Sequence, residues 1–500
     1  MASSCFGEGY MGLGRTLGMG ALALVAVGAG VVVVRTATFK PPAQTDLKSV
    51  KLAPAVQVDA NLAAQHLGQA IRFQTVTHQN PADDQLGEWD KLQAWMITTY
   101  PAAHRAMSRE VVDGHTLIYT WAGSDPSLKP VILMAHQDVV PITPGTEKDW
   151  KHAPFGGEIA DGYVWGRGAF DDKGALISIF EGVEALAQSG FKPKRTIIVV
   201  SGHNEETRGG GAKVAAEVLK QRGVQAYFLL DEGFSGTTQD AFTGKPLARV
   251  LIAEKGYGTI RITANAAGGH SSAPPKETAV ATLAKAVLAI ADKPYPMKLQ
   301  GPVRTSYQAL GPQMGWTDRM MLANLWLFGP WLKQRIAATP VGAAGLHTTI
   351  APTMLEGSPK ENVLPQKAVA RINFRLAPGD TTAEVMEKSK AAVGRLPVTL
   401  SWEKPPFEPT AASSTSSDGW RFISAAAGDA TGAPVAPGLM RAGTDSWFFR
   451  PLARDTYLFT PMLLSPDEEK MVHGTNEKVP VDGLGKMIQF YARLIATAAG

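Results

Sequence analysis

The chain has 500 residues, 45% of them hydrophobic and 19% charged, and a formal net charge of +4. That length is too great for one ordinary hydrophobic core and predicts more than one domain. The small net charge, with no dense run of lysine and arginine, gives no support to nucleic-acid binding. Cys5 is the only cysteine, which excludes an intrachain disulfide and a thiolate metal cluster.

The first predicted element is an uncharged apolar segment, Thr16 to Val34, with an arginine on either side. As a helix it would be roughly 28 Å long, enough to cross a bilayer, and no clear cleavage site follows it. We therefore expect residues 1–40 to be an uncleaved membrane anchor, with a cleaved secretion signal as the alternative, and residues 41–56 to be a linker. We expect the remainder to be extracytoplasmic, although the basic residues after the segment favour the cytoplasmic side by the positive-inside rule.

After the linker, helix-like and strand-like segments alternate. Helices are predicted around residues 59–70, 88–105, 175–187 and 212–221, and buried strands at 131–135, 196–200 and 226–230. This rhythm is typical of parallel strands joined by helical crossovers. It predicts an α/β domain over residues 57–255 that resumes, after an insertion, at residues 406–498.

The insertion is recognised by a change of pattern near residue 256. Apolar and polar residues alternate in GTIRITA and AVARINFRL, as in antiparallel strands with one buried face. A helix is predicted near residues 278–292, and an apolar stretch follows at 314–334. Residues 256–405 are therefore predicted to be an α+β module.

Acidic residues and a histidine follow the predicted strands of the first half. His136 comes after one strand, the pair Glu205 and Glu206 after the next, and Asp231 after the third. Open α/β sheets bind their ligands at this carboxyl edge, and a histidine among several carboxylates suits a divalent ion such as Zn²⁺. Taken singly, each signal is weak: most adjacent glutamates lie in solvated loops, and most histidines at strand ends are structural.

The spacing of these residues along the chain indicates separate roles for them. His136 and Asp138 are two apart, so on an extended backbone both side chains face one way and Asp138 can hold the imidazole. Glu205 and Glu206 are neighbours, so they point in opposite directions and can do different jobs. Asp171 lies among glycines in GRGAFDDKG, directly before a predicted helix.

Eight motifs occur in an order known from one family: AHQDVVP, WGRGAFDDKG, HNEET, LLDEG, GGHSSAPP, NVLP, INFRLAPGD and GTDS. Through them the chain, over about residues 57–498, resembles the dinuclear zinc amidohydrolases and exopeptidases that include carboxypeptidase S, aminoacylase-1 and carnosinase. The similarity is greatest to the branch of carboxypeptidase S and the N-fatty-acyl-amino-acid synthase/hydrolases. The resemblance implies an α/β, zinc-exopeptidase-like catalytic domain in two pieces, 57–255 and 406–498, with 256–405 as an α+β lid and dimerisation domain.

The resemblance also implies roles for single residues. Two zinc ions per subunit would be bridged by Asp171, with Co²⁺ or Mn²⁺ as other possible metals. One ion would be held by His136 and Asp231, and the other by Glu206 and His473. Glu205 would be the general base for a bridging hydroxide, Asp138 would orient His136, and His270 would reach the oxyanion from a partner subunit. The substrate and its carboxylate would contact Asn362, Arg375, Gly443 and Thr444, with backbone N–H groups of the 443–446 loop among the donors.

Outside these roles, we expect Asp172 to cap a helix and His203 to be structural, and Trp447 departs from the polar residue expected there.

The implied reaction is hydrolysis of an amide beside a free carboxylate, in N-acyl amino acids or short peptides. Condensation of a fatty acid with an amino acid at the same site is an alternative, because an enzyme does not set the direction of an equilibrium. A catalytically inactive, membrane-tethered binding protein would lack a ligand or Glu205, and none is missing. A purely structural dimer on the membrane is the weakest alternative. The expected partners are the substrate, a second subunit and the membrane.

The apolar stretch of the insertion has more hydrophobic side chains than one buried stripe requires. Residues at helical spacing define that stripe: Met321, Leu325, Phe328 and Leu332. Core packing is its expected role, while three nearby tryptophans leave an acyl-chain channel or bilayer contact open. On this basis we expect long-chain N-acyl amino acids to be better substrates than N-acetyl amino acids and dipeptides.

Overall fold

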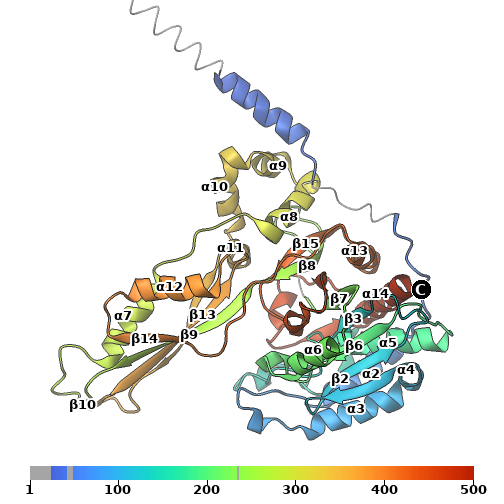
Figure 1. Ribbon diagram of the computed structural model, residues 1–500, viewed down its shortest axis with the longest axis horizontal. Helices are drawn as coiled ribbons and strands as arrows, with labels where there is room; N and C mark the ends of the chain where they lie inside the picture. Colours follow the sequence, from blue (N-terminus) through green and yellow to red (C-terminus); the bar gives the residue numbers. More distant parts are fainter. Residues whose placement is uncertain (1–23, 42–48, 234–235) are drawn as a thin grey trace, which may run out of the picture.

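The structure, a computed structural model, describes residues 24–41, 49–233 and 236–500. A large sheet with helices on both faces forms the main body, and a smaller sheet extends from it as an arm (Figure 1). The chain enters the arm after residue 255 and returns to the main body before residue 418. The main body is therefore built from two separate stretches of sequence.

The large sheet is mixed and has the strand order β1-β2-β6-β3-β7-β16-β8-β15. Its strands are β1 (Ser108–Val112), β2 (Thr116–Trp121), β3 (Val131–Met134), β6 (Ile197–Ser201), β7 (Phe228–Asp231), β8 (Ala248–Glu254), β15 (Val435–Met440) and β16 (Thr456–Leu458). The three strands predicted from apolar runs, β3, β6 and β7, lie side by side and run parallel. In contrast, β2 is antiparallel to β6, so the crossover pattern describes only the centre of the sheet.

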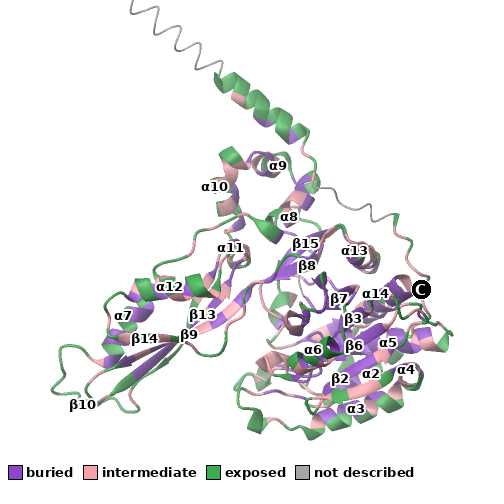
Figure 2. Cartoon of the chain, in the orientation of Figure 1, coloured by how far each residue is buried: buried purple, intermediate pink, exposed green. Residues whose placement is uncertain are grey.

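Helices cover both faces of this sheet. Neighbouring residues of each strand point to opposite faces, so each buried strand contributes to two hydrophobic cores. Leu133 of β3 belongs to one core, under α2 (Ala60–Arg72), α5 (Lys173–Gln188), α13 (Asp418–Thr431) and α14 (Val481–Ala499). Ile132 belongs to the other core, under α6 (Gly211–Gln221). Figure 2 shows the central strands buried between these layers.

The helix predicted over residues 88–105 is two helices, α3 (Gly87–Thr99) and α4 (Pro101–Ala106). Proline has no N–H to donate, so it is tolerated at the start of a helix and not inside one. Pro101 therefore begins α4 and separates it from α3. A small sheet beside α2 contains β4 (Glu158–Ala160), β5 (Tyr163–Trp165) and β17 (Lys478–Pro480).

The arm is a four-stranded antiparallel sheet with the order β11-β13-β9-β14. Its strands are β9 (Gly256–Asn265), β11 (Thr349–Glu356), β13 (Lys367–Leu376) and β14 (Val398–Trp402). Apolar residues alternate with polar ones along β9 and β13, and the apolar set packs under α7 (Ala279–Ala291) and α12 (Thr382–Val393). The short strands β10 (Gly269–His270) and β12 (Val363–Leu364) pair at the far tip of the arm (Figure 1).

The apolar stretch of the insertion belongs to a group of short helices between the arm and the main body. These are α8 (Gly301–Leu310), α9 (Trp316–Ala323), α10 (Leu325–Ile336) and α11 (Pro340–Leu346). Leu332 is fully buried in their shared core, and Met321 and Leu325 pack against it. The expected core packing is found for these three residues of the stripe; the fourth, Phe328, is absent from this core and its ring lies against the exposed Trp331. Trp326 and Trp331, in contrast, are 62% and 58% exposed.

A helix over residues 24–37 contacts the junction of α9 and α10 with its C-terminal end, and the rest of the helix projects away from the molecule (Figure 1). The guanidinium of Arg35 donates to the carbonyl of Ala323, and the amide of Asn324 donates to the carbonyl of Val32. Within the described residues, no helix combines the length and apolar character needed to cross a membrane. Residues 16–23, the first part of the predicted anchor, lie outside the described residues.

Candidate metal centre and active site

The carboxyl ends of the central strands bring the predicted ligand residues together. His136 follows β3, and Glu232 follows β7 directly after Asp231. Glu205 and Glu206 lie in a short 3-10 turn after β6. His136 and Glu232 are 3% and 5% exposed. Each buried parallel strand ends at this edge, so their first loop residues gather there.

Asp171 is at the centre of the cluster and directs one oxygen at each of two histidines. Its Oδ1 lies 3.2 Å from Nε2 of His136, and its Oδ2 lies 3.1 Å from Nε2 of His473. The same Nε2 of His473 is 3.1 Å from Oε2 of Glu206. Two ligands of one tetrahedral zinc ion lie roughly 3.3 Å apart when each is bound at about 2.1 Å. These distances therefore fit residues that bind the same metal ions, with Asp171 between two ion positions.

The cluster holds more carboxylates than its own histidines can neutralise. Burial, together with neighbouring charges, raises the pKa of Glu205 and of Glu232 well above the ordinary value. Burial and the nearby Asp171 raise the pKa of Glu206 to about 7. Among the described residues, no hydrogen-bond partner is found for the buried Oε1 of Glu206. Buried, crowded and unpartnered carboxylate oxygens suit bound cations, so the residues present fit a divalent metal centre.

Asp138 holds the glutamate pair as well as facing the imidazole. Its Oδ1 accepts from the N–H of Glu205 at 3.0 Å, and its Oδ2 accepts from the N–H of Glu206 at 3.1 Å. The imidazole Nδ1 of His136 is 3.0 Å from the backbone oxygen of Asp138 and 3.4 Å from its Oδ1. Asp138 therefore faces the imidazole as expected, and its backbone carbonyl is a nearer acceptor than its carboxylate. When Nδ1 of His136 donates its proton to an acceptor, Nε2 carries no proton and can bind a metal.

Asp231 and Glu232 face different partners. Both oxygens of Asp231 accept backbone N–H groups at 2.9 Å, one from Glu232 and one from Ser446. The carboxylate of Glu232 lies instead 3.5 Å from Nε2 of His136. The motif LLDEG contains both acids, and sequence alone does not tell which one turns toward the cluster. Glu232 thus joins the candidate ligands, beside the predicted Asp231.

The two acids make a direct test of ligand identity. We expect Glu232→Gln to lower the bound metal by about tenfold or more at limiting zinc, because it removes an anionic oxygen beside His136. Asp231→Asn is the matched control and should retain more metal, since its side chain mainly accepts backbone N–H groups. Elemental analysis of both proteins measures this. A larger metal loss in Asp231→Asn would return Asp231 to the ligand set in place of Glu232.

The loop at residues 443–446 is occupied by internal bonds. The N–H of Thr444 donates to Oε1 of Glu254 at 2.9 Å, and the N–H of Ser446 donates to Asp231. Glu254 is fully buried and paired with Arg450 at 3.0 Å. The expectation that this loop offers these N–H groups to a substrate carboxylate is therefore corrected, because two buried carboxylates already accept them.

The predicted substrate residues fall into two separate places. Gly443 and Thr444 line a pocket that also contains Glu205, and Arg375 lies nearby at the end of β13 that pairs with the start of β9. His270 and Asn362 lie together at the far tip of the arm, where the N–H of Ser271 donates to the carbonyl of Asn362 (Figure 1). One chain alone does not bring them to the metal cluster.

Two further expectations concern residues beside the cluster. Asp172 stands at the cap position of α5, but its side chain makes no capping bond. Its Oδ2 accepts from the N–H of His136 at 3.2 Å instead, so the capping role is corrected. His203 lies 2.7 Å from the hydroxyl of Thr116, in keeping with a structural residue.

The profile of peptidase family M20/M25/M40 matches residues 132–497. The chain belongs to this peptidase family. The N-fatty-acyl-amino acid synthase/hydrolase PM20D1 of Xenopus tropicalis is 36% identical over 399 residues, 78% of this chain and 76% of the relative. The probable carboxypeptidase S-like 2 of Dictyostelium discoideum is 34% identical over 439 residues, 86% of this chain and 84% of the relative. Among solved structures, the M20 family metallo-carboxypeptidase Sso-CP2 of Sulfolobus solfataricus has a TM-score of 0.65 at 16% identity, covering 87% of this chain and 98% of its own.

Membership of the M20 family confirms the class expected from the motifs. The chain is a metal-dependent hydrolase of the carboxypeptidase S and N-fatty-acyl-amino acid synthase/hydrolase branch. Its fold is the M20 arrangement of an α/β catalytic domain with an inserted domain. The acidic cluster at the strand ends is the part of this fold whose residues suit the metal.

One supporting residue of this M20 site carries no signal in the sequence. The Oε1 of Glu477 accepts from the N–H groups of Phe170 and Asp171 at 2.9 Å and 3.0 Å. Its Oε2 pairs with Arg167 at 2.6 Å, and both side chains are buried. Glu477 therefore fixes the loop of Asp171, although the two residues are 306 positions apart.

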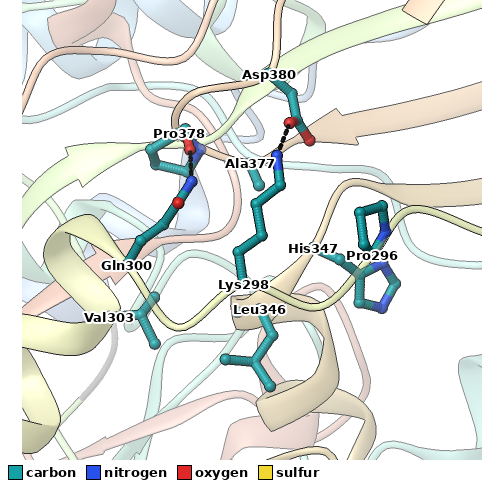
Figure 3. Close-up of a pocket in the computed structure, with 10 residues that line it drawn as sticks. Pro296, Lys298, Gln300, Val303, Leu346, His347, Ala377, Pro378 and Asp380 are labelled. Carbon is teal, nitrogen blue, oxygen red and sulfur yellow. Dashed lines mark hydrogen bonds and ion pairs between the residues drawn. The ribbon is translucent and has the colours of Figure 1, made fainter. Parts of the chain in front are cut away.

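A hollow in the inserted domain of this M20 chain lies away from the cluster and has its charges satisfied. Figure 3 shows Lys298 paired with Asp380, their Nζ and Oδ1 being 2.9 Å apart, and the amide of Gln300 donating to the carbonyl of Pro378 at 3.1 Å. None of the predicted site residues lines it. The pocket beside Glu205 is the better candidate for substrate.

Proposed function

We propose that this M20 hydrolase cleaves the amide bond of N-acyl amino acids or short peptides beside their free carboxylate. The observation that carries the proposal is the position of Glu205. It belongs to one candidate ligand group with His136 and Glu232, and it also lines the pocket with Arg208 and Gly443. A carboxylate between a metal centre and a basic pocket can act as the base in cleaving an amide bond when the anion beside that amide is bound in the pocket.

The roles of the chain's own residues follow from this position. His136, Asp171, Glu206 and His473, with Asp231 or Glu232, would hold two zinc ions. Zinc bound there would supply a Lewis acid and lower the pKa of water toward neutrality. Glu205 would accept a proton from water and return it to the departing amine, as a general base and then acid. The backbone N–H of Glu205 donates a hydrogen bond to Oδ1 of Asp138, which keeps the backbone of Glu205 in place.

We propose long-chain N-acyl amino acids as the preferred substrates, because the 36% identical relative is named for N-fatty-acyl amino acids. The stripe of α9 and α10 packs in a core, and the tryptophans first considered for an acyl channel are exposed, so the preference rests on the relatives. Each buried CH₂ contributes roughly 0.8 kcal/mol. We expect kcat/KM to rise along an acyl series from acetyl to oleoyl, measured without detergent. A flat series, or cleavage of dipeptides alone, would contradict the preference. Condensation, which that relative's name includes, is the same reaction in reverse.

We also propose a homodimer formed through the inserted domain. His270 and Asn362 lie at the tip of the arm, where a second copy is needed to bring them to a metal cluster (Figure 1). Met354 and Leu355 on the edge strand β11 are 50% and 69% exposed. An exposed apolar edge strand favours pairing with another chain.

Finally, we propose that the N-terminal helix attaches the protein to a membrane, with the catalytic domain on the extracytoplasmic side. Leu24, Val25 and Val27 of that helix are at least 65% exposed, and Trp326 and Trp331 are exposed on the adjoining α10. Tryptophan is enriched where proteins meet the bilayer interface. Co-sedimentation with vesicles should be lost when residues 1–40 are deleted; equal sedimentation of both proteins would contradict this.

A further inference from the structure

Two guanidinium groups lie over the same aromatic ring, that of Tyr257, beside Glu205. The Cζ of Arg208 is 3.9 Å from the ring centre of Tyr257, and the Cζ of Arg375 is 4.6 Å from the same centre. The two charges are therefore no further apart than the sum of these distances. Burial, and then the nearby Arg208, lower the pKa of Arg375 to about 10. Two like charges this close in a partly buried place are stabilised by an anion that contacts both.

No hydrogen-bond acceptor is found for either guanidinium among the described residues, whereas two other basic side chains there have acceptors. Arg195 also lies 3.9 Å from a tyrosine ring, but it donates to the carbonyls of Lys129 and Ala498. Lys255, in the same pocket as Arg208, donates to two backbone carbonyls at 2.9 Å. Both guanidinium groups are half-buried, so their unused N–H donors are available to an anionic ligand in the pocket.

The backbone places Arg208 in the pocket at some cost. Its φ is +52°, in the left-handed region that favours glycine. Its N–H donates to the carbonyl of Glu205 at 2.7 Å, so the guanidinium is attached to the turn of the proposed base. A Cβ at Gly443 would lie 2.5 Å from Nη2 of Arg208, so any side chain at residue 443 would displace the guanidinium from its present position. An unfavourable conformation kept beside a site indicates a role there.

We propose that Arg208 and Arg375 form a two-guanidinium clamp for the free carboxylate of the substrate, with Arg208 as a second anion-binding residue on the catalytic domain. This rests on the proposed function. The N–H groups of Thr444 and Ser446 are already bonded, so they are not free for the carboxylate, whereas the guanidinium donors of Arg208 and Arg375 are. A guanidinium binds a carboxylate through two parallel N–H bonds.

The clamp joins the two domains through the substrate. Arg208 comes from the turn after β6, whereas Arg375 and Tyr257 face each other on β13 and β9 of the arm. A carboxylate bound by both would fix the neighbouring amide relative to Glu205, since base and anion site share one turn. Correct placement of reacting groups is a large part of catalysis.

The test compares an N-acyl amino acid with its carboxamide, which has the same acyl group and side chain but no carboxylate. We expect Arg208→Gln to lower kcat/KM for the acid by about 10- to 100-fold, and to change the carboxamide by less than about threefold. Arg208→Lys, which keeps the charge without the fork, should fall between. Arg105→Gln, exposed on α4, is the control and should match the wild type. Glutamine and lysine carry the same Cβ as arginine, so the strain at residue 208 is unchanged.

A binding measurement separates this proposal from the proposed reaction. Calorimetry with the metal-free chain should show weaker binding of the acid to Arg208→Gln, and thermal unfolding should show that both variants are folded. If the wild type cleaves neither compound yet binds the acid in an Arg208-dependent way, the clamp stands and the proposed function fails. Equal losses on acid and carboxamide, or no loss with either variant, would overturn the clamp.

Discussion

Replacing Glu205 with glutamine is expected to lower kcat by about 10³-fold, because glutamine cannot accept a proton from water or return it to the leaving amine. Bound metal should remain near the wild-type level, since the amide keeps the shape of the side chain. The N–H of residue 205 would still donate to Asp138, so the turn should also be retained. The measurement is turnover of an N-acyl amino acid alongside elemental analysis of the same preparation.

Glu206→Gln serves as the neighbouring comparison. Its Oε2 lies 3.1 Å from Nε2 of His473, so this substitution removes a charge from the metal centre and should reduce the metal content. Glu217→Gln, exposed on α6, should change neither quantity. If Glu205→Gln and Glu206→Gln lose metal to the same extent, the division of roles within the glutamate pair is wrong.

Mixing two inactive variants is expected to restore activity if the site is shared between subunits. His270→Ala removes the tip residue and Glu205→Gln removes the base, so each homodimer should be inactive. In a heterodimer, one cluster has an intact Glu205 and receives an intact His270 from the other chain. Random assortment then gives about a quarter of wild-type activity for a two-fold dimer. The physical basis is the position of His270 at the arm tip, remote from its own cluster (Figure 1).

The complementation requires heterodimers whose composition is known. Two affinity tags, one on each variant, allow sequential purification before the assay. A mixture of His270→Ala with itself under both tags is the matched control and should remain inactive. Absence of recovery in purified heterodimers would show that His270 does not act on the partner's cluster.

The main body was largely predictable because its central strands are buried on both faces. Continuous apolar runs mark β3, β6 and β7, and helical periodicity marks α5 and α6. The antiparallel neighbours were not predictable, since the periodicity of β2 is the same for either direction of pairing. The break between α3 and α4 depends on one proline inside an otherwise helical pattern.

The site was predictable where a residue belongs to a local motif and unpredictable where its role depends on a distant partner. His136, Asp171 and Glu206 follow from their motifs and meet in the structure. Glu254 holds the N–H of Thr444 across 190 positions, and no short pattern indicates that bond. For Asp231 and Glu232 the motif contains both acids, and the direction of each side chain is set by the N–H groups around Asp231.

The most direct test of a two-zinc hydrolase is a zinc titration of the metal-free chain, with bound zinc and turnover of an N-acyl amino acid measured on each sample. We expect almost no turnover without metal and a rise that reaches its plateau at two zinc ions per chain. Full turnover in a preparation shown by elemental analysis to contain no divalent metal would contradict it.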